Sequence, residues 1–159
     1  MVIVSDASPI IALAVCDKLD LLDKLFDRVC IPQTVFNDLA IPNKTKAEEI
    51  IKWASDKVTP AKNTAVITAL SMNLDLGESE ALSLYWEIAA DFLLIDEKRG
   101  RIIALRNGIK TIGTMGILLS AKKNGFITAV KPVLDILMHN SFRISDTLYQ
   151  QILERAKEL

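Results

Sequence analysis

Two short apolar segments, each ending at an aspartate and followed by a helical pattern, constrain the fold of this chain most. The first runs through residues 2–5 to Asp6, and the second runs through residues 92–95 to Asp96. Apolar runs of this length between turn signals are typical of buried strands. Because strands alternate with helical stretches along the sequence, the pattern predicts a parallel sheet with helices on both faces.

The rest of the chain extends this plan. We expect a helix-rich, three-layer α/β/α sandwich with a short parallel sheet, built by residues 1–159 as a single domain without repeats or linkers. Two further strands are predicted at residues 28–31 and 110–112. Helices are predicted at residues 9–15, 19–26, 33–40, 45–57, 63–72, 77–89, 114–124, 133–139 and 146–157, with one more through 102–105 that stops at Gly108.

Capping residues predict several helix boundaries. Ser8 is the predicted N-cap of the first helix, with Pro9 at the first helical position. Thr45 and Ser145 are the predicted caps of two later helices. Thr114 has two interpretations: it caps the helix that follows it, or its hydroxyl contacts a phosphate together with the free N–H groups of the helix start.

Charge and cysteine usage narrow the functional classes. The formal net charge of −1 gives no general attraction to nucleic acid, so RNA binding must depend on a local basic patch or on a metal. Cys16 and Cys30 fit neither a metal-ligand spacing nor a disulfide framework, and we expect buried, reduced thiols. No basic segment precedes the first apolar run and no apolar stretch reaches spanning length, which predicts a cytoplasmic protein without membrane contact.

Four acids are the candidate catalytic residues: Asp6, Asp38, Glu78 and Asp96. Two of them end strands and Glu78 begins a helix, positions that face one edge of a parallel sheet. Carboxylates gathered there repel each other unless a cation lies between them. Carboxylate and water oxygens suit Mg²⁺ or Mn²⁺, and a metal-bound water can attack a phosphodiester in line. The sequence alone does not establish that the four acids meet.

Each acid also has an ordinary structural explanation. Asp6 suits a strand-to-helix turn. Glu78 and Glu80 lie in a first helical turn, where the helix dipole stabilises acids by about 0.3–1 kcal/mol each. Asp38, taken alone, is an acid on the side of a helix.

Basic residues crowd the segment after Asp96, namely Lys98, Arg99, Arg101 and Arg106. They form either a solvated face or a positive strip that guides an RNA backbone to the acids. Arg101 also has the option of pairing with a nearby carboxylate. The last predicted helix is amphipathic, with an apolar side that completes the core or contacts a partner; that side comprises Ile144, Leu148, Ile152 and Leu153.

Several short motifs, in their order and spacing, resemble a PIN domain, the nuclease fold of many prokaryotic VapC-type toxins. The resemblance covers nearly the whole chain and is similar in its later motifs to a mostly uncharacterised PIN-like subgroup. The motifs are Asp6-Ala7-Ser8-Pro9, Ile31-Pro32 leading to Val35 and Asp38, Gly77-Glu78-Ser79-Glu80-Ala81, Leu94-Ile95-Asp96-Glu97 with Arg101, and Gly113-Thr114-Met115-Gly116.

The resemblance implies a magnesium- or manganese-dependent ribonuclease. Asp6, Asp38 and Glu78 match the first three acids of the family, and either Asp96 or Glu97 matches the fourth. Six residues are candidates for substrate contact or for holding metal-bound water: Ser8, Glu80, Glu97, Lys98, Arg101 and Thr114. The family also implies RNA as substrate, a homodimer and a cognate antitoxin protein.

Two other classes of function remain open on the sequence. The first is a PIN-like nucleic-acid-binding or protein-interaction module that lacks strong nuclease activity. The second is an α/β phosphotransfer enzyme, which is disfavoured because neither strand-end aspartate, Asp6 nor Asp96, begins an Asp-x-Asp motif.

Overall fold

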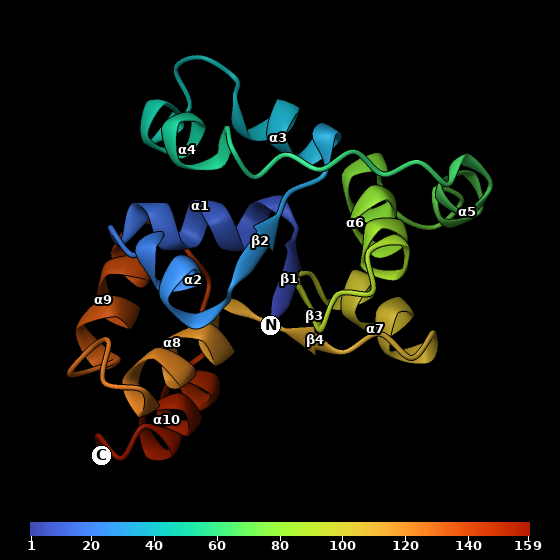
Figure 1. Ribbon diagram of the computed structural model, residues 1–159. Coiled ribbons are helices and arrows are strands. Elements are labelled where there is room, and N and C mark those ends of the chain that lie inside the picture. Colours follow the sequence, from blue (N-terminus) through green and yellow to red (C-terminus); the bar gives the residue numbers. More distant parts are fainter.

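A parallel sheet of four strands forms the centre of the computed structural model, which describes residues 1–159 (Figure 1). The strands are β1 (Val2–Ser5), β2 (Arg28–Cys30), β3 (Phe92–Leu94) and β4 (Thr111–Ile112), in the order β2-β1-β3-β4. All three pairings are parallel. The predicted parallel sheet is confirmed, with β2, β3 and β4 each one residue shorter than expected.

Helices cover both faces of this sheet, which confirms the predicted α/β/α sandwich. One face is covered by α6 (Leu76–Glu87) and α7 (Lys98–Arg106), and α5 (Thr64–Leu70) lies outside α6. The larger core on the other face collects residues from α1 (Ala7–Val15), α2 (Asp20–Leu25), α3 (Gln33–Leu39), α4 (Ala47–Ala54), α8 (Thr114–Lys123), α9 (Lys131–His139) and α10 (Asp146–Arg155).

Most strand residues are apolar because both faces of the sheet are buried. Ile3 and Leu94 point into the larger core, whereas Val4 and Leu93 point into the smaller one. All four side chains are fully buried. A slip of one residue would exchange the two faces, so the burial on both sides fixes the register.

Three predicted helix starts differ from the structure by two residues, and one of them is α9, which begins at Lys131 rather than at residue 133. The first helix begins at Ala7, with Asp6 as the N-cap residue, rather than at Pro9 behind Ser8. Proline is tolerated there because the N–H groups of a first helical turn have no helical partner. The fourth helix begins at Ala47 rather than Thr45, since Lys46 has a left-handed φ of 61° that interrupts the helical backbone. The predicted cap at Ser145 is confirmed, because its hydroxyl accepts a bond from the Leu148 N–H.

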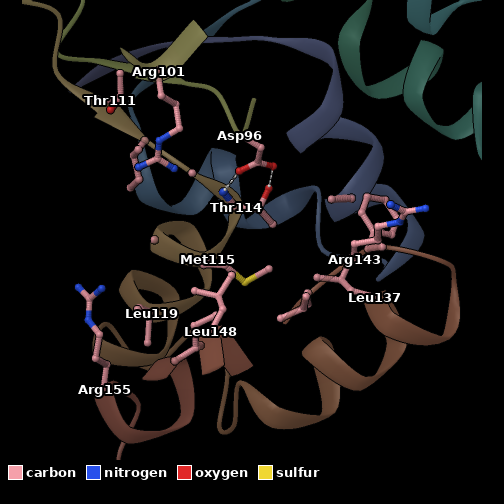
Figure 2. A pocket seen from close by; sticks show the side chains of 17 residues that line it. Asp96, Arg101, Thr111, Thr114, Met115, Leu119, Leu137, Arg143, Leu148 and Arg155 are labelled. Atoms are coloured by element: carbon pink, nitrogen blue, oxygen red, sulfur yellow. Dashed lines mark hydrogen bonds between the residues drawn. The ribbon is translucent and has the colours of Figure 1, made fainter. Parts of the chain in front are cut away.

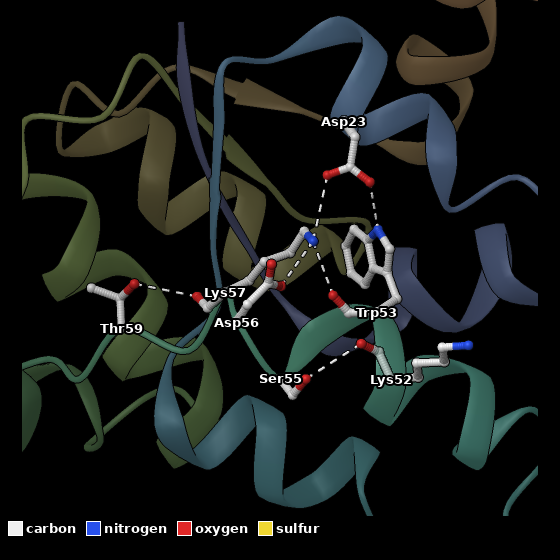
Figure 3. Close-up of polar contacts among 7 residues, drawn as sticks. All are labelled: Asp23, Lys52, Trp53, Ser55, Asp56, Lys57 and Thr59. Carbon is white, nitrogen blue, oxygen red and sulfur yellow. Dashed lines mark hydrogen bonds and ion pairs between the residues drawn. The ribbon is translucent and has the colours of Figure 1, made fainter.

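A polar cluster ties α4 to α2 (Figure 3). The Lys57 Nζ lies 4.6 Å from the centre of the Trp53 ring, bonds the Trp53 carbonyl at 2.9 Å, and pairs with Asp23 at 3.5 Å. The Trp53 Nε1 donates to the same Asp23 at 2.7 Å. The chain then forms a single parallel bridge between Val58 and Ile31. This cluster therefore holds the segment that contains α3 and α4 against the edge of the sheet.

Strand order creates a crevice at the carboxyl ends of β1 and β3. From β1 the chain continues to β2 on one side, and β3 pairs with β1 on the other side. Such a reversal opens the crevice in which ligands bind in parallel α/β sheets. The Asp6 N–H donates to the Leu94 carbonyl at 3.0 Å, so Asp6 lies at this point, and Asp96 follows two residues after Leu94.

Two further expectations can be compared with the structure. Cys16 and Cys30 are buried free thiols, as predicted. None of the helices is both long and apolar enough to cross a bilayer.

Candidate functional site

Asp6 lies almost buried at the end of β1, with only 7% of its surface exposed. Burial raises the pKa of its carboxyl from 3.8 to about 7. The Ala7 N–H opposes this rise in pKa, whereas the negative charges of Glu78, Asp75 and Asp96 add to it. The side chain makes no helix-capping hydrogen bond. At neutral pH, Asp6 is thus an acid near its pKa, and other acidic side chains contribute to that pKa.

Asp96 and Glu97 have separate tasks. Asp96 is exposed and accepts two hydrogen bonds from Thr114, at 2.7 Å from the backbone N–H and 2.5 Å from the hydroxyl. Glu97 is the N-cap residue of α7 and accepts the Gly100 N–H at 2.6 Å. The predicted capping role of Thr114 is therefore wrong: Gly113 is the N-cap residue of α8, and the Thr114 hydroxyl fixes Asp96 instead.

Glu78 is buried in the first turn of α6, where it forms a capping box with Asp75. The Glu78 N–H donates to Asp75 at 2.8 Å, and the Asp75 N–H donates to Glu78 at 3.1 Å. Burial raises the pKa of Glu78, and the charges of Asp75 and Glu97 raise it further, against the opposing effects of the Asp75 N–H and of Arg99. Glu78 is therefore close enough to affect the pKa of Asp6, while one of its carboxylate oxygens already accepts the Asp75 N–H.

Asp38 lies at the edge of the four candidate acids. It is exposed on α3, and its Oδ2 is 3.7 Å from the place where a Cβ would stand on Gly77. An oxygen of Asp75 is 3.5 Å from the same place. Asp38 is not among the charges that raise the pKa of Asp6. The charges of Glu78, Asp75 and Asp96 thus act on Asp6, whereas Asp38 lies beside Gly77 and Asp75.

Two of the candidate supporting residues lie apart from this group. Glu80 accepts hydrogen bonds from the Thr34 N–H, at 3.2 Å, and from the Thr34 hydroxyl, so it fastens the start of α3 to α6. This structural use differs from the first-turn dipole interaction expected from the sequence, since Glu80 lies beyond the first turn of α6. Ser8 is exposed in the first turn of α1 and caps nothing.

The basic residues of α7 divide between two cavities. Lys98, Arg99 and Arg106 line one of about 520 Å³, together with Glu97 and Asn73. Arg101 lines a second cavity of about 530 Å³, which also includes Asp96 (Figure 2). The structure contains no ion pair of Arg101, so the pairing considered from the sequence is not formed.

The donor chemistry fits a hydrated divalent metal. Across the chain, no group of three or more His, Cys, Asp or Glu side chains is arranged to hold a metal ion in common. Magnesium, however, binds one or two carboxylates directly and keeps several waters. Asp6 and Asp96, at the ends of adjoining strands, are the pair that can supply those carboxylates; burial raises the pKa of Asp6, and nearby negative charges raise it further.

Comparison with known proteins agrees with this geometry. The family model described as a PIN domain matches residues 2–158. The chain belongs to the PIN domain family. PIN domains are generally nucleases and typically use divalent metal ions. No curated protein and no solved structure matches this PIN domain.

Sequence reasoning missed three residues of this PIN domain's site region. Asp75 stands three residues before Glu78, a spacing that marks a capping box, so a signal for it was available. Arg143 and Arg155 line the same cavity as Asp96 and Arg101. No local pattern marks them, because only tertiary folding brings the C-terminal segment to α8.

Proposed function

We propose that this PIN domain is a magnesium- or manganese-dependent endoribonuclease that hydrolyses RNA phosphodiesters. The observation that supports this most is the accumulation of acids at the end of β1, where burial and three nearby carboxylates raise the pKa of Asp6 to about 7. A divalent cation relieves this repulsion, so such a group favours cation binding.

The residues divide the work in this proposal. Asp6 and Asp96 are the direct metal ligands, and Glu78 is either a third ligand or the acceptor of a metal-bound water. When bound, the metal offsets charge on the phosphate oxygens and lowers the pKa of a bound water. Thr114 holds the Asp96 carboxylate in one orientation through two hydrogen bonds. Glu78, whose pKa is raised by burial, is the candidate acceptor for the proton of the attacking water.

The biological setting is also a proposal. We infer that the domain is the toxin of a prokaryotic toxin–antitoxin pair, which acts in the cytoplasm as a homodimer and is neutralised by a cognate antitoxin protein. The order of its motifs, from Asp6-Ala7-Ser8-Pro9 to Gly113-Thr114-Met115-Gly116, supports this because it resembles that of VapC-type toxins. Two buried free thiols, Cys16 and Cys30, suit a reducing compartment.

Metal removal is the direct test. We expect RNA cleavage in millimolar MgCl₂ or MnCl₂ at pH 8 and no cleavage in EDTA. We also expect the metal to stabilise the fold, by about 2.7 kcal/mol at a hundred times its Kd, because it binds only the folded site. Cleavage is measured on labelled single-stranded RNA, and stability by urea unfolding. Asp6→Asn serves as the control that should lose both effects of the metal.

A second candidate function, a binding module without nuclease activity, has support of its own. No three acids are arranged as ready ligands, and one oxygen of Glu78 is engaged in the capping box. Calorimetric titration separates the two functions. Absence of metal binding at millimolar concentration, with the fold intact by circular dichroism, favours the binding module and rejects the nuclease.

A further inference from the structure

The cavity beside Asp96 is large enough for a nucleotide. Its volume is about 530 Å³, within the range of small-molecule sites in proteins. It lies between α8, the segment that joins α9 to α10, and α10 itself. Figure 2 shows Asp96 and Thr114 at one end and apolar side chains in the middle. Asp96 lines this cavity, so the cavity adjoins one of the proposed metal ligands.

Three arginines line this cavity, and none of them forms an ion pair within the chain. Arg101, Arg143 and Arg155 all line it, from α7, the segment before α10 and α10 (Figure 2). The eight ion pairs of the structure use lysines or the amino terminus as cations, and none uses an arginine. These guanidinium groups are therefore free to bind anions, and their planar donors match phosphate oxygens.

The interior of the same cavity is apolar. Met115 and Leu119 of α8 and Leu148 and Ile152 of α10 line it, and Phe142 adds an aromatic ring. Leu148 is 40% exposed, so α10 uses part of its apolar side for the cavity rather than for the core. A ligand that satisfies this lining must combine a flat or apolar body with negative charge at its edge, as a nucleotide does.

We propose that this cavity is a nucleotide subsite, which binds one unstacked base of single-stranded RNA next to the phosphodiester held at Asp6 and Asp96. The base lies against Met115 and Leu148, and the adjoining phosphates contact Arg101 and Arg143. Single-stranded RNA is commonly recognised through bases that leave the stack and enter such pockets. This inference rests on the proposed nuclease function, and it adds where the base next to the cleaved phosphodiester binds.

Binding in EDTA tests the subsite without cleavage. The probe is fluorescein-labelled, single-stranded hexauridylate, and its affinity is measured by anisotropy. Arg143→Ala is expected to weaken binding about tenfold, because a charged hydrogen bond is lost, and to reduce the slope of log K against log salt by about one. Arg28→Ala is the matched control, since Arg28 is an exposed arginine on β2 that lines neither cavity; its affinity should equal that of the wild type.

A methyl signal separates binding in the cavity from general attraction to charge. With ¹³C-labelled methionine, we expect the Met115 resonance to shift on addition of hexauridylate and the signal of Met72, which is 83% exposed elsewhere, to stay in place. An unmoved Met115 signal at saturation, or equal affinities of Arg143→Ala and Arg28→Ala, would overturn the subsite. A Met115 response to an acidic apolar peptide but not to RNA would also overturn it, in favour of a protein-docking site.

The two proposals fail in different ways. Intact, metal-dependent cleavage with no effect of Arg143→Ala on binding rejects the subsite and leaves the nuclease. Specific binding at Met115 with no cleavage in any metal rejects the nuclease and leaves an RNA-binding cavity.

Discussion

Asp6→Asn is expected to abolish metal-dependent RNA cleavage and, in the absence of metal, to stabilise the fold above neutral pH. The wild-type carboxyl has a pKa of about 7 in the folded protein, against 3.8 ordinarily. The folded state therefore holds this proton more tightly than the unfolded state, and the unfolding free energy falls as pH rises from about 4 to about 7. A shift of this size corresponds to roughly 4 kcal/mol when fully expressed, and asparagine removes it.

Urea unfolding in EDTA at pH 4 and pH 8 measures this effect. The variant should gain stability at pH 8 and gain little at pH 4, where the wild-type acid is largely protonated. Asp56→Asn is the matched control, because the Asp56 side chain is 81% exposed and pairs only with Lys57; its stability should change by no more than about 0.5 kcal/mol. Full cleavage by Asp6→Asn would remove Asp6 from the mechanism, and a loss of stability at pH 8 would contradict the burial argument.

Gly113→Ala is expected to reduce cleavage about a hundredfold while leaving the protein folded. A Cβ at this position would stand 2.7 Å from Nη1 of Arg101 and 2.9 Å from Oδ1 of Asp96, so both side chains must move. The cost in stability is small, because these are the ends of side chains rather than backbone atoms. The cost in rate is large, since displacement of a catalytic group by about 1 Å lowers rates about a hundredfold.

Cleavage rate and melting temperature together test the Gly113→Ala prediction. The comparison variant is Gly108→Ala, which forces alanine into a positive φ of 73° after α7 but meets no atom within 4 Å. It should lose about 1 kcal/mol of stability and keep its cleavage rate. If Gly113→Ala cleaves like the wild type, Asp96 does not need its observed orientation, and Glu97 becomes the better candidate for the fourth acid.

The sheet could be predicted because its signals are local. A strand buried on both faces is mostly apolar, and the runs before Asp6 and Asp96 show this directly. Helix starts were less predictable where backbone geometry decided them. Pro9 is the third residue of α1 and not the first, and the left-handed conformation of Lys46 delays α4 beyond Thr45.

The residues of the candidate site were likewise predictable only where the signal in the sequence is local. Asp6 and Asp96 are visible from the sequence because each follows a strand, and all parallel strands end at one edge. Neither interpretation of Thr114 included its bond to Asp96, since that bond joins residues 18 positions apart. The Arg143 contribution depends on how α10 packs against α8, which no short pattern encodes.

The reciprocal bonds between Asp75 and Glu78 have a consequence for ligand binding. If Glu78 turns toward a cation, the amide of Asp75 loses its acceptor. The first turn of α6 must then loosen when the metal binds. Metal binding would then reduce the order of the first turn of α6. The affinity for the metal would therefore be lower than the negative charge of the carboxylates alone implies. The same exchange makes deuterium uptake at the Asp75 amide a local reporter of loading, independent of any substrate.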